Sequence, residues 1–550
     1  MNAPTPFRLL LTLFRDRFFE NDSASPGGGF QTNITQVLGI IGGNGTMMAY
    51  FVMPAFLELS LQPPTPRILW TLRSFRLFFP AYSFAVAGFA AVFQWDLLFP
   101  DRRDFLILAP FPIRLRELMA AKFTALVLFL LMLAAAVNVG PDLLVLLASA
   151  FAGRTAVPVA LGQICATGAA SLFAFLAVAA MQGILISVTP PKLFRRISPW
   201  IQMLGMSVMV LTVLGFPVYS AFLRRAIEQN QTWLYWFPPA WFSGLYEIFL
   251  GGGNRVLTSL GMFAIEMTAI AIVVVVAAWS LGFRRHFRRT LESEDAPHRP
   301  RAWSVPQWLV RNPQERAIFA FVGKTMARSQ KHQFFLAAYL SAGLAVAAII
   351  GTAVRNGRIA LSPGGARAVA FVIGFFLISG FRAAFQFPAE LGANWLFRIT
   401  EARWTEVSRK ATRKLVLAMT LIASMLVAAP FELTAWAWPV VLEHLVVQAI
   451  AAALLIEALF WSLDRVPFTC SYFPGRKSLP LLVILYVYGV TGYSFHLADL
   501  ESAIEHRSAT ALLFFAGAAA ALVFSWRRHP VADAVRFDGS EPVIQTLELT

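Results

Sequence analysis

Long apolar runs recur along the whole chain, and no other feature restricts the possible folds as strongly. Of the 550 residues, 57% are hydrophobic and 14% are charged, and the mean hydropathy is +0.63. Each run holds roughly 18 to 25 residues, which is enough for a helix to cross the hydrocarbon core of a bilayer. About twelve such runs predict an all-α polytopic membrane protein with twelve transmembrane helices.

The predicted crossings form two groups of six, separated by a basic, proline-containing linker at residues 283–333. The first half, 31–282, has crossings predicted at 34–57, 77–97, 119–139, 157–187, 199–222 and 257–282. The second half, 334–528, has crossings predicted at 334–353, 367–387, 411–430, 437–462, 479–495 and 509–526, followed by a tail at 529–550. Before the first crossing, the segment 1–30 alternates apolar and charged residues at helical spacing, which predicts an amphipathic helix on the inner leaflet.

The net charge of +16 does not indicate nucleic-acid binding, because most Lys and Arg fall in loops on one side of the predicted crossings. Such a bias marks the cytoplasmic side of a membrane protein. We therefore expect a multi-pass protein of the plasma (inner) membrane with both termini in the cytoplasm.

One cytoplasmic loop is unusual, and it lies between the second and third crossings. Its sequence, FPDRRDFLILAPFPIRLRELMAAK, places the charged run 101–104 before an apolar step at 105–109 and then adds prolines and further arginines. The segment is too polar for lipid and too apolar for a free loop. It predicts a short helix on the cytoplasmic membrane face, with its charged side offered to a soluble partner.

The second half carries a shortened copy of this loop, FPAELGANWLFRITEARWTEVSRK, again between its second and third crossings. The same interval separates Pro100 from Lys122 and Pro388 from Lys410. This match predicts a duplication into two parallel halves, related by an axis along the membrane normal.

The sequence contains no complete ATP-binding motif. Gly323-Lys324-Thr325 ends like a phosphate-binding loop, but Ile318 stands where the first glycine is required. Leu361-Ser362-Pro363-Gly364-Gly365 resembles an ATP-cassette signature only weakly, and it falls in a predicted outer loop. We therefore expect a chain that is not itself an enzyme and holds no cofactor, so that any energy from ATP has to come from another chain.

The FPDRRDFLILAPFPIRLRELMAAK loop resembles the inner loop of type-2 ABC exporter permeases, the membrane subunits that pair with a separate ATPase. The amphipathic start and the segment FPPAWFSGLYEIFLGG resemble the elbow helix and outer re-entrant hairpin of the same family. The resemblance covers the first half well, whereas the second half has no Pro-Pro-Ala-Trp hairpin.

The resemblance implies coupling helices that contact an ABC ATPase, in two copies that carry ATP and Mg²⁺, and a small-molecule or lipid-like cargo of unknown identity. The residues implied to contact the ATPase are Pro100, Asp101, Arg102, Arg103, Asp104, Pro110, Pro112 and Arg114, with Glu390, Arg398, Glu401 and Arg403 in the second half. The residues implied for the outer hairpin are Pro238, Pro239, Trp241 and Glu247. A simpler interpretation of the aromatic hairpin remains, because Trp and Tyr also collect at membrane interfaces.

Acidic residues inside the tenth crossing have to face protein or water, because a charge facing lipid is costly. Glu457 lies about as far from the inner end of its crossing as Arg382 does in the eighth, which predicts an ion pair between them. The alternative is a proton or cation path along this helix.

Two other classes of function are compatible with the architecture. A twelve-helix secondary (ion-coupled) carrier has the same helix count and linker, but its usual motif after the second crossing has glycine where this loop has proline. An integral-membrane enzyme acting on lipid-linked substrates needs clustered acids, histidines or metal ligands at one face, and the sequence does not supply such a cluster.

Overall fold

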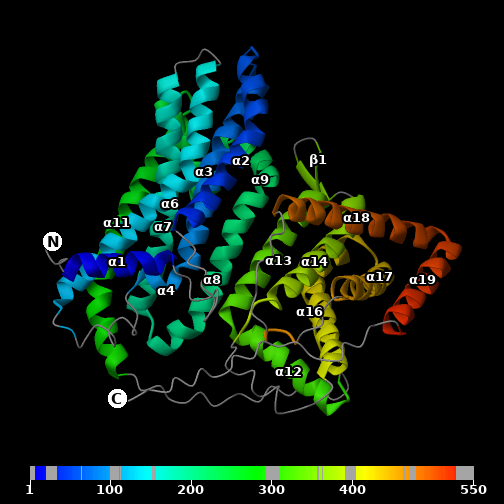
Figure 1. Ribbon diagram of the computed structural model, residues 1–550. Coiled ribbons are helices and arrows are strands. Elements are labelled where there is room, and N and C mark those ends of the chain that lie inside the picture. The colour runs from blue at the N-terminus through cyan, green and yellow to red at the C-terminus, as the bar shows by residue number, and fades with distance from the viewer. Residues whose placement is uncertain are drawn as a thin grey trace, which may run out of the picture. The chain divides into compact units, whose positions relative to one another are not determined.

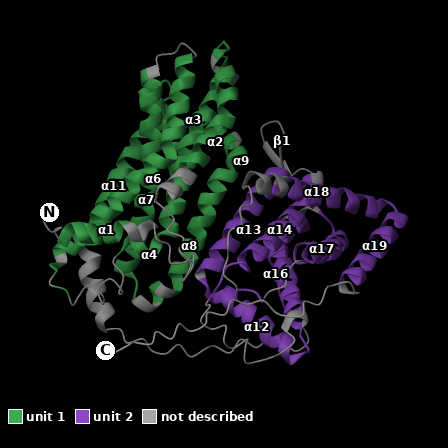
Figure 2. Cartoon of the chain, viewed as in Figure 1, with its two compact units in different colours: residues 1–297 green, residues 298–550 purple. Residues whose placement is uncertain are grey.

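The computed structural model describes residues 6–19, 34–63, 65–99, 111, 113–151, 156–292, 310–355, 358–361, 363–389, 404–461, 466–469 and 479–527. Nearly all of these residues are helical (Figure 1). The chain divides into two compact units, Met1–Pro297 and His298–Thr550 (Figure 2). The boundary lies inside the segment 283–333 that was predicted to be a linker.

Unit 1 contains ten α-helices and one 3₁₀ helix among its described residues. They are α1 (Pro6–Phe19), α2 (Ile34–Leu61), α3 (Pro66–Phe93), α4 (Trp95–Leu98), α6 (Leu115–Phe151), α7 (Ala156–Val188), α8 (Pro191–Leu214), α9 (Phe216–Glu228), η2 (Thr232–Trp236), α10 (Pro238–Phe249) and α11 (Arg255–Glu292).

Unit 2 contains seven helices and one antiparallel β-hairpin among its described residues. They are α12 (Pro313–Arg328), α13 (Gln330–Gly351), β1 (Thr352–Arg355), β2 (Arg358–Leu361), α14 (Pro363–Ala384), α16 (Trp404–Ala435), α17 (Trp438–Leu459), α18 (Leu479–His506) and α19 (Ser508–Arg527). In the hairpin, Thr352 pairs with Leu361 and Arg355 with Arg358.

Ten of the described helices are long and apolar enough to cross a membrane, which confirms a helical polytopic membrane protein. They are α3, α6, α7, α8, α11, α13, α14, α16, α17 and α19. The two other predicted crossings, 34–57 and 479–495, fall on α2 and α18, each 28 residues long.

Several boundaries differ from the sequence prediction. The third crossing, predicted to end at 139, continues through Pro141 to Phe151. The fifth, predicted over 199–222, is interrupted at Gly215, and α9 begins directly afterwards with Pro217 in its first turn. The predicted linker contains α12, and the connection between the seventh and eighth crossings contains the β-hairpin.

The two units share a pattern of helix contacts. The second crossing is central in each, since α3 contacts α2, α6, α7 and α8, while α14 contacts α13, α16, α17 and α18. Each unit also begins with a helix that lies against its third crossing, namely α1 against α6 and α12 against α16. These correspondences are what a duplication would produce.

Local sequence explains where several helices start. The Thr65 hydroxyl accepts a hydrogen bond from the Ile68 amide at 3.4 Å, and Pro66 occupies the first position of α3. Asn312 caps α12 in the same way, accepting from the Gln314 amide at 2.9 Å ahead of Pro313. Asn254 accepts from the first amides of α11 at 3.0 and 3.1 Å.

A large apolar cluster of unit 1 lies where α3, α7, α10 and α11 meet, and it includes Phe84, Phe242 and Leu260. In unit 2 the corresponding cluster lies between α12, α14, α16 and α17, and it includes Phe319, Phe381 and Phe460. Both clusters surround the central helix of their unit, so displacing that helix would disturb the whole core.

Candidate functional site

The junction where unit 1 leaves its second crossing is a buried, clamped point of the chain. α4 ends at Phe99, whose extended backbone (φ −118°, ψ 156°) is the conformation that a following proline favours. The Lys122 ammonium donates a hydrogen bond to the Phe99 carbonyl at 3.2 Å, and Lys122 is 4% exposed. The Phe99 ring stacks on Trp279 of α11 with 5.7 Å between ring centroids.

Further contacts tie this junction to the rest of unit 1. The Lys122 ammonium lies 5.4 Å from the ring centroid of Phe14, a cation–π contact that reaches α1. Gln182 of α7 donates from Nε2 to the Trp95 carbonyl at 2.9 Å. The last residues before the predicted coupling loop are therefore fastened to α1, α6, α7 and α11.

Unit 2 clamps the corresponding carbonyl with a different side chain. His332 is fully buried, and its Nε2 donates to the Phe387 carbonyl at 3.1 Å. Because a carbonyl only accepts, Nε2 carries a proton, and Nδ1 forms a second hydrogen bond with the Ser329 hydroxyl at 2.6 Å. The Phe387 ring stacks on Phe335 with 4.2 Å between centroids.

In both units, therefore, a buried side chain donates a hydrogen bond to the carbonyl of the phenylalanine in a Phe-Pro pair. The sequence predicted the repeated Phe-Pro but not its clamps. Lys122 lies one loop after Pro100, whereas His332 lies one crossing before Pro388. The two clamping residues therefore do not stand at the same interval from their prolines.

Most of the predicted ATPase-contacting residues lie outside the described residues. These are Pro100, Asp101, Arg102, Arg103, Asp104, Pro110, Pro112, Glu390, Arg398, Glu401 and Arg403. Arg114 is described, and its side chain is exposed. Its carbonyl accepts from the amides of Glu117 and Leu118 at 2.9 and 3.2 Å, so Arg114 marks the start of α6.

The segment predicted as the outer hairpin, 237–252, forms α10, with η2 directly before it, and α10 packs against α3, α7 and α11. Pro238 begins α10, Pro239 is buried behind it, and buried Trp241 donates from Nε1 to the Leu234 carbonyl at 3.1 Å. A methyl group on Gly244 would lie 2.2 Å from the Leu257 carbonyl oxygen, so glycine is what allows α10 to reach α11.

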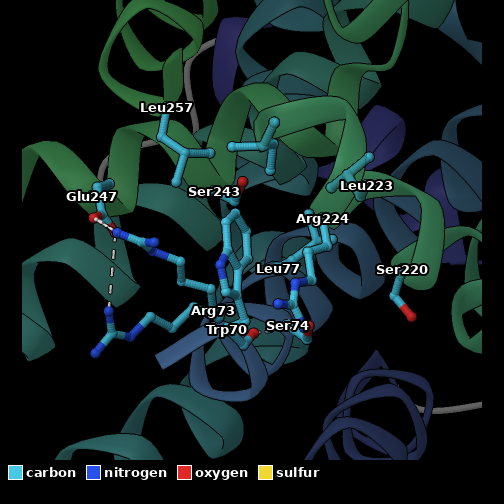
Figure 3. A pocket seen from close by; sticks show the side chains of 12 residues that line it. Trp70, Arg73, Ser74, Leu77, Ser220, Leu223, Arg224, Ser243, Glu247 and Leu257 are labelled. Carbon is cyan, nitrogen blue, oxygen red and sulfur yellow. Dashed lines mark hydrogen bonds and ion pairs between the residues drawn. The ribbon is translucent and has the colours of Figure 1, made fainter. Parts of the chain in front are cut away.

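Trp241 and Tyr246 of this hairpin are buried, at 6% and 1% exposure, as a packed re-entrant element requires. Trp236, directly before the hairpin, is 88% exposed, as in an interfacial belt. Glu247 is buried, and its carboxylate binds Arg73 at 2.8 Å and Arg76 at 4.0 Å, both on α3 (Figure 3). A role as an outer gate stays a prediction.

Glu457 binds Arg413 and Ser525 in the structure. Its Oε1 lies 2.7 Å from Nη1 of Arg413 on α16, and its Oε2 accepts from the Ser525 hydroxyl at 2.7 Å. The Arg382 guanidinium lies over the Phe460 ring, 6.0 Å from its centroid. A direct contact between Arg382 and Glu457 stays a prediction.

Sequence reasoning missed one cluster, which we name the acid–histidine cluster: Glu432, His444 and Glu501. His444 Nδ1 lies 2.8 Å from Glu501, and His444 Nε2 lies 3.4 Å from Glu432. All three side chains are at most 4% exposed. The three residues lie on three different helices, α16, α17 and α18, so each of them looks isolated in the sequence.

A weak signal was available for part of this cluster. Glu432 and His444 face each other across the short corner between α16 and α17, and Trp436 in that corner contacts the His444 ring with centroids 5.7 Å apart. Glu501 comes from a distant helix, and no local pattern points to it. One turn further along α18, Glu505 binds Arg367 of α14 at 2.7 Å.

Among the described residues, no group of His, Cys, Asp and Glu is arranged to hold a metal ion. Comparison with models of protein families, with curated proteins and with solved structures found no match.

Proposed function

We propose that this chain is the membrane-spanning permease subunit of an ATP-driven exporter of the ABC type. It consists of two parallel six-helix halves in the plasma (inner) membrane, with both termini in the cytoplasm. Separate ATPase subunits, in two copies that carry ATP and Mg²⁺, act on the loops between the second and third crossings. The resemblance of the FPDRRD loop, the start helix and the hairpin supports this assignment.

The observation that carries the proposal is the pair of clamped junctions. A push on either loop arrives first at Phe99 or Phe387, whose carbonyls are held by buried Lys122 and His332. Each clamp adjoins the central helix of its unit, and α1 or α12 lies beside the helix that follows the loop. Displacement of a loop is therefore passed to packed helices instead of being absorbed locally.

The proposal is tested by reconstituting the chain in liposomes with the ATPase that co-purifies with it. We expect the membrane chain to change the ATPase rate, and reversal of charge at Arg102 and Arg103 to abolish that change while the chain stays inserted. An unchanged ATPase rate in that double variant would argue against docking at this loop.

One observation favours a second candidate, a twelve-helix secondary carrier. The acid–histidine cluster places a titratable imidazole between two buried carboxylates, the kind of group that proton-coupled carriers use. A carrier of this kind would move solute on a proton gradient in liposomes that hold this chain alone. The ATP-driven proposal predicts no such movement.

A further inference from the structure

Unit 1 contains an open pocket at the end that holds Glu247 (Figure 3). Its walls come from the first turns of α3, the length of α9, the middle of α10 and the start of α11. The residues of the clamped junctions are not among those that line it.

The polar wall of the pocket carries excess positive charge. Three arginines line it, Arg73, Arg76 and Arg224, against a single carboxylate, Glu247. Glu247 binds Arg73 and Arg76, and Arg224 pairs at 3.1 Å with Glu228, which lies outside the lining and is 42% exposed. An exposed ion pair contributes little to stability, so Arg224 can leave Glu228 and bind an anion at a small cost in free energy.

Trp70 holds two of these guanidinium groups in place. The Arg73 and Arg224 guanidinium carbons lie 5.1 and 5.6 Å from the centroid of its ring, and Figure 3 shows the indole between the two side chains. Cation–π contacts orient a guanidinium without using its N–H donors. Arg73 gives one donor to Glu247 and Arg224 gives one to Glu228, and since a guanidinium has five N–H donors, others remain for an anion in the pocket.

The floor of the pocket is apolar. Leu77, Leu223 and Leu257 are each 3% exposed and belong to the large apolar cluster of unit 1. A ligand that fills the pocket has to place an anionic group among the arginines and hydrocarbon against the leucines.

We propose that this pocket binds an amphiphilic oxyanion, a phosphate or carboxylate head on an alkyl tail. The planar fork of Arg matches the geometry of such heads. A membrane lipid and a soluble alkyl phosphate both supply this chemistry. The proposal depends on the contacts within unit 1 and not on ATP-driven export, so each can fail without the other.

The test is a calorimetric titration of the full chain, in nanodiscs of zwitterionic lipid, with hexyl phosphate, inorganic phosphate and the neutral hexyl glucoside. Empty nanodiscs correct for partition into the bilayer. Because the tail buries methylene groups, we expect hexyl phosphate to bind about tenfold more tightly than inorganic phosphate. Hexyl glucoside is expected to bind more weakly than hexyl phosphate, because its head carries no charge.

Variants of Arg224 identify the site. Arg224→Gln is expected to weaken hexyl phosphate binding about tenfold, and Arg224→Lys to weaken it less, because a charged hydrogen bond is lost in the first and its geometry in the second. Arg196→Gln, which removes an exposed arginine from α8, is the matched control and should bind as the wild type does. Equal binding by wild type and Arg224→Gln, or equal binding of hexyl glucoside, would overturn the proposal.

A second arm separates the two sources of ligand. The wild-type titration is repeated in nanodiscs that contain phosphatidic acid. Competition that lowers hexyl phosphate affinity in the wild type but not in Arg224→Gln assigns the site to a lipid. Unchanged affinity assigns it to a soluble anion.

Discussion

The two units contrast most strongly at the ends opposite their clamped junctions. In unit 1 this end is basic, with three arginines and Glu247 around an open pocket. In unit 2 it is filled by the acid–histidine cluster, in which the side chains are nearly fully buried. The contacts of the central helices α3 and α14 are nevertheless alike. A repeated helical frame thus tolerates opposite polar chemistry at one end while it keeps a clamp at the other.

The largest effect is expected from the acid–histidine cluster. His444→Leu leaves two buried carboxylates without a counter-charge, and such a loss costs about 3–5 kcal/mol. Hydrogen exchange measured by mass spectrometry should show faster exchange in α16, α17 and α18, with α10 and α11 unchanged. Uniform exchange across both units would mean that the cluster does not stabilise unit 2 selectively.

The next largest effect is expected in unit 1, at the contact between α10 and α11. Gly244→Ala places a methyl group against the Leu257 carbonyl and separates α10 from α11, which costs about 1–3 kcal/mol. We expect faster exchange in α10 and weaker binding at the Arg224 pocket. Gly517→Ala is the matched control, because a methyl group there meets no atom within 4 Å. Identical behaviour of the two variants would contradict the close packing of the hairpin.

The clamps test whether the shared ends of the two units are equivalent. Lys122→Met and His332→Phe each remove a hydrogen bond from the carbonyl of Phe99 or Phe387, a loss of about 1–3 kcal/mol. Both variants are expected to insert and to bind the ATPase while the effect of the chain on the ATPase rate is lost. If only one variant loses its effect on the ATPase rate, only that half of the chain transmits the displacement of its loop.

The smallest effect concerns the partner of Glu457. A double-mutant cycle between Glu457→Gln and Arg413→Gln should give a coupling of about 1 kcal/mol in thermal unfolding. The same cycle with Arg382→Gln tests the pair predicted from the sequence. A coupling near zero between Glu457 and Arg413 would contradict the contact that the structure shows.

Much of the helical framework could be predicted from the sequence, because hydropathy and helix-end signals are carried by residues that are neighbours in the chain. The tenth and twelfth crossings, predicted at 437–462 and 509–526, nearly coincide with α17 and α19. The end of the third crossing was wrong because Asn138, Pro141 and Asp142 look like a loop. In the structure, Gln163 and Thr167 of α7 donate to the Asp142 carboxylate at 3.1 and 3.2 Å, so the helix continues.

The polar contacts of the candidate sites were much harder to predict. The acid–histidine cluster, the Arg224 pocket and the His332 clamp each join residues from helices far apart in sequence. Which faces of those helices meet is decided by packing, and periodicity alone does not reveal it. Lys122 and Phe99 lie in one predicted loop region, yet nothing local indicated that the ammonium would bind that carbonyl.

Co-purification from native membranes in mild detergent tests the central claim most directly, with the wild type and the Arg102→Glu, Arg103→Glu variant compared side by side. The account predicts that the wild type retains a second chain carrying both a complete phosphate-binding loop and a cassette signature. It also predicts that the variant, equally well inserted, loses that chain. Wild-type protein that retains no ATPase and still moves solute on an ion gradient would contradict the account.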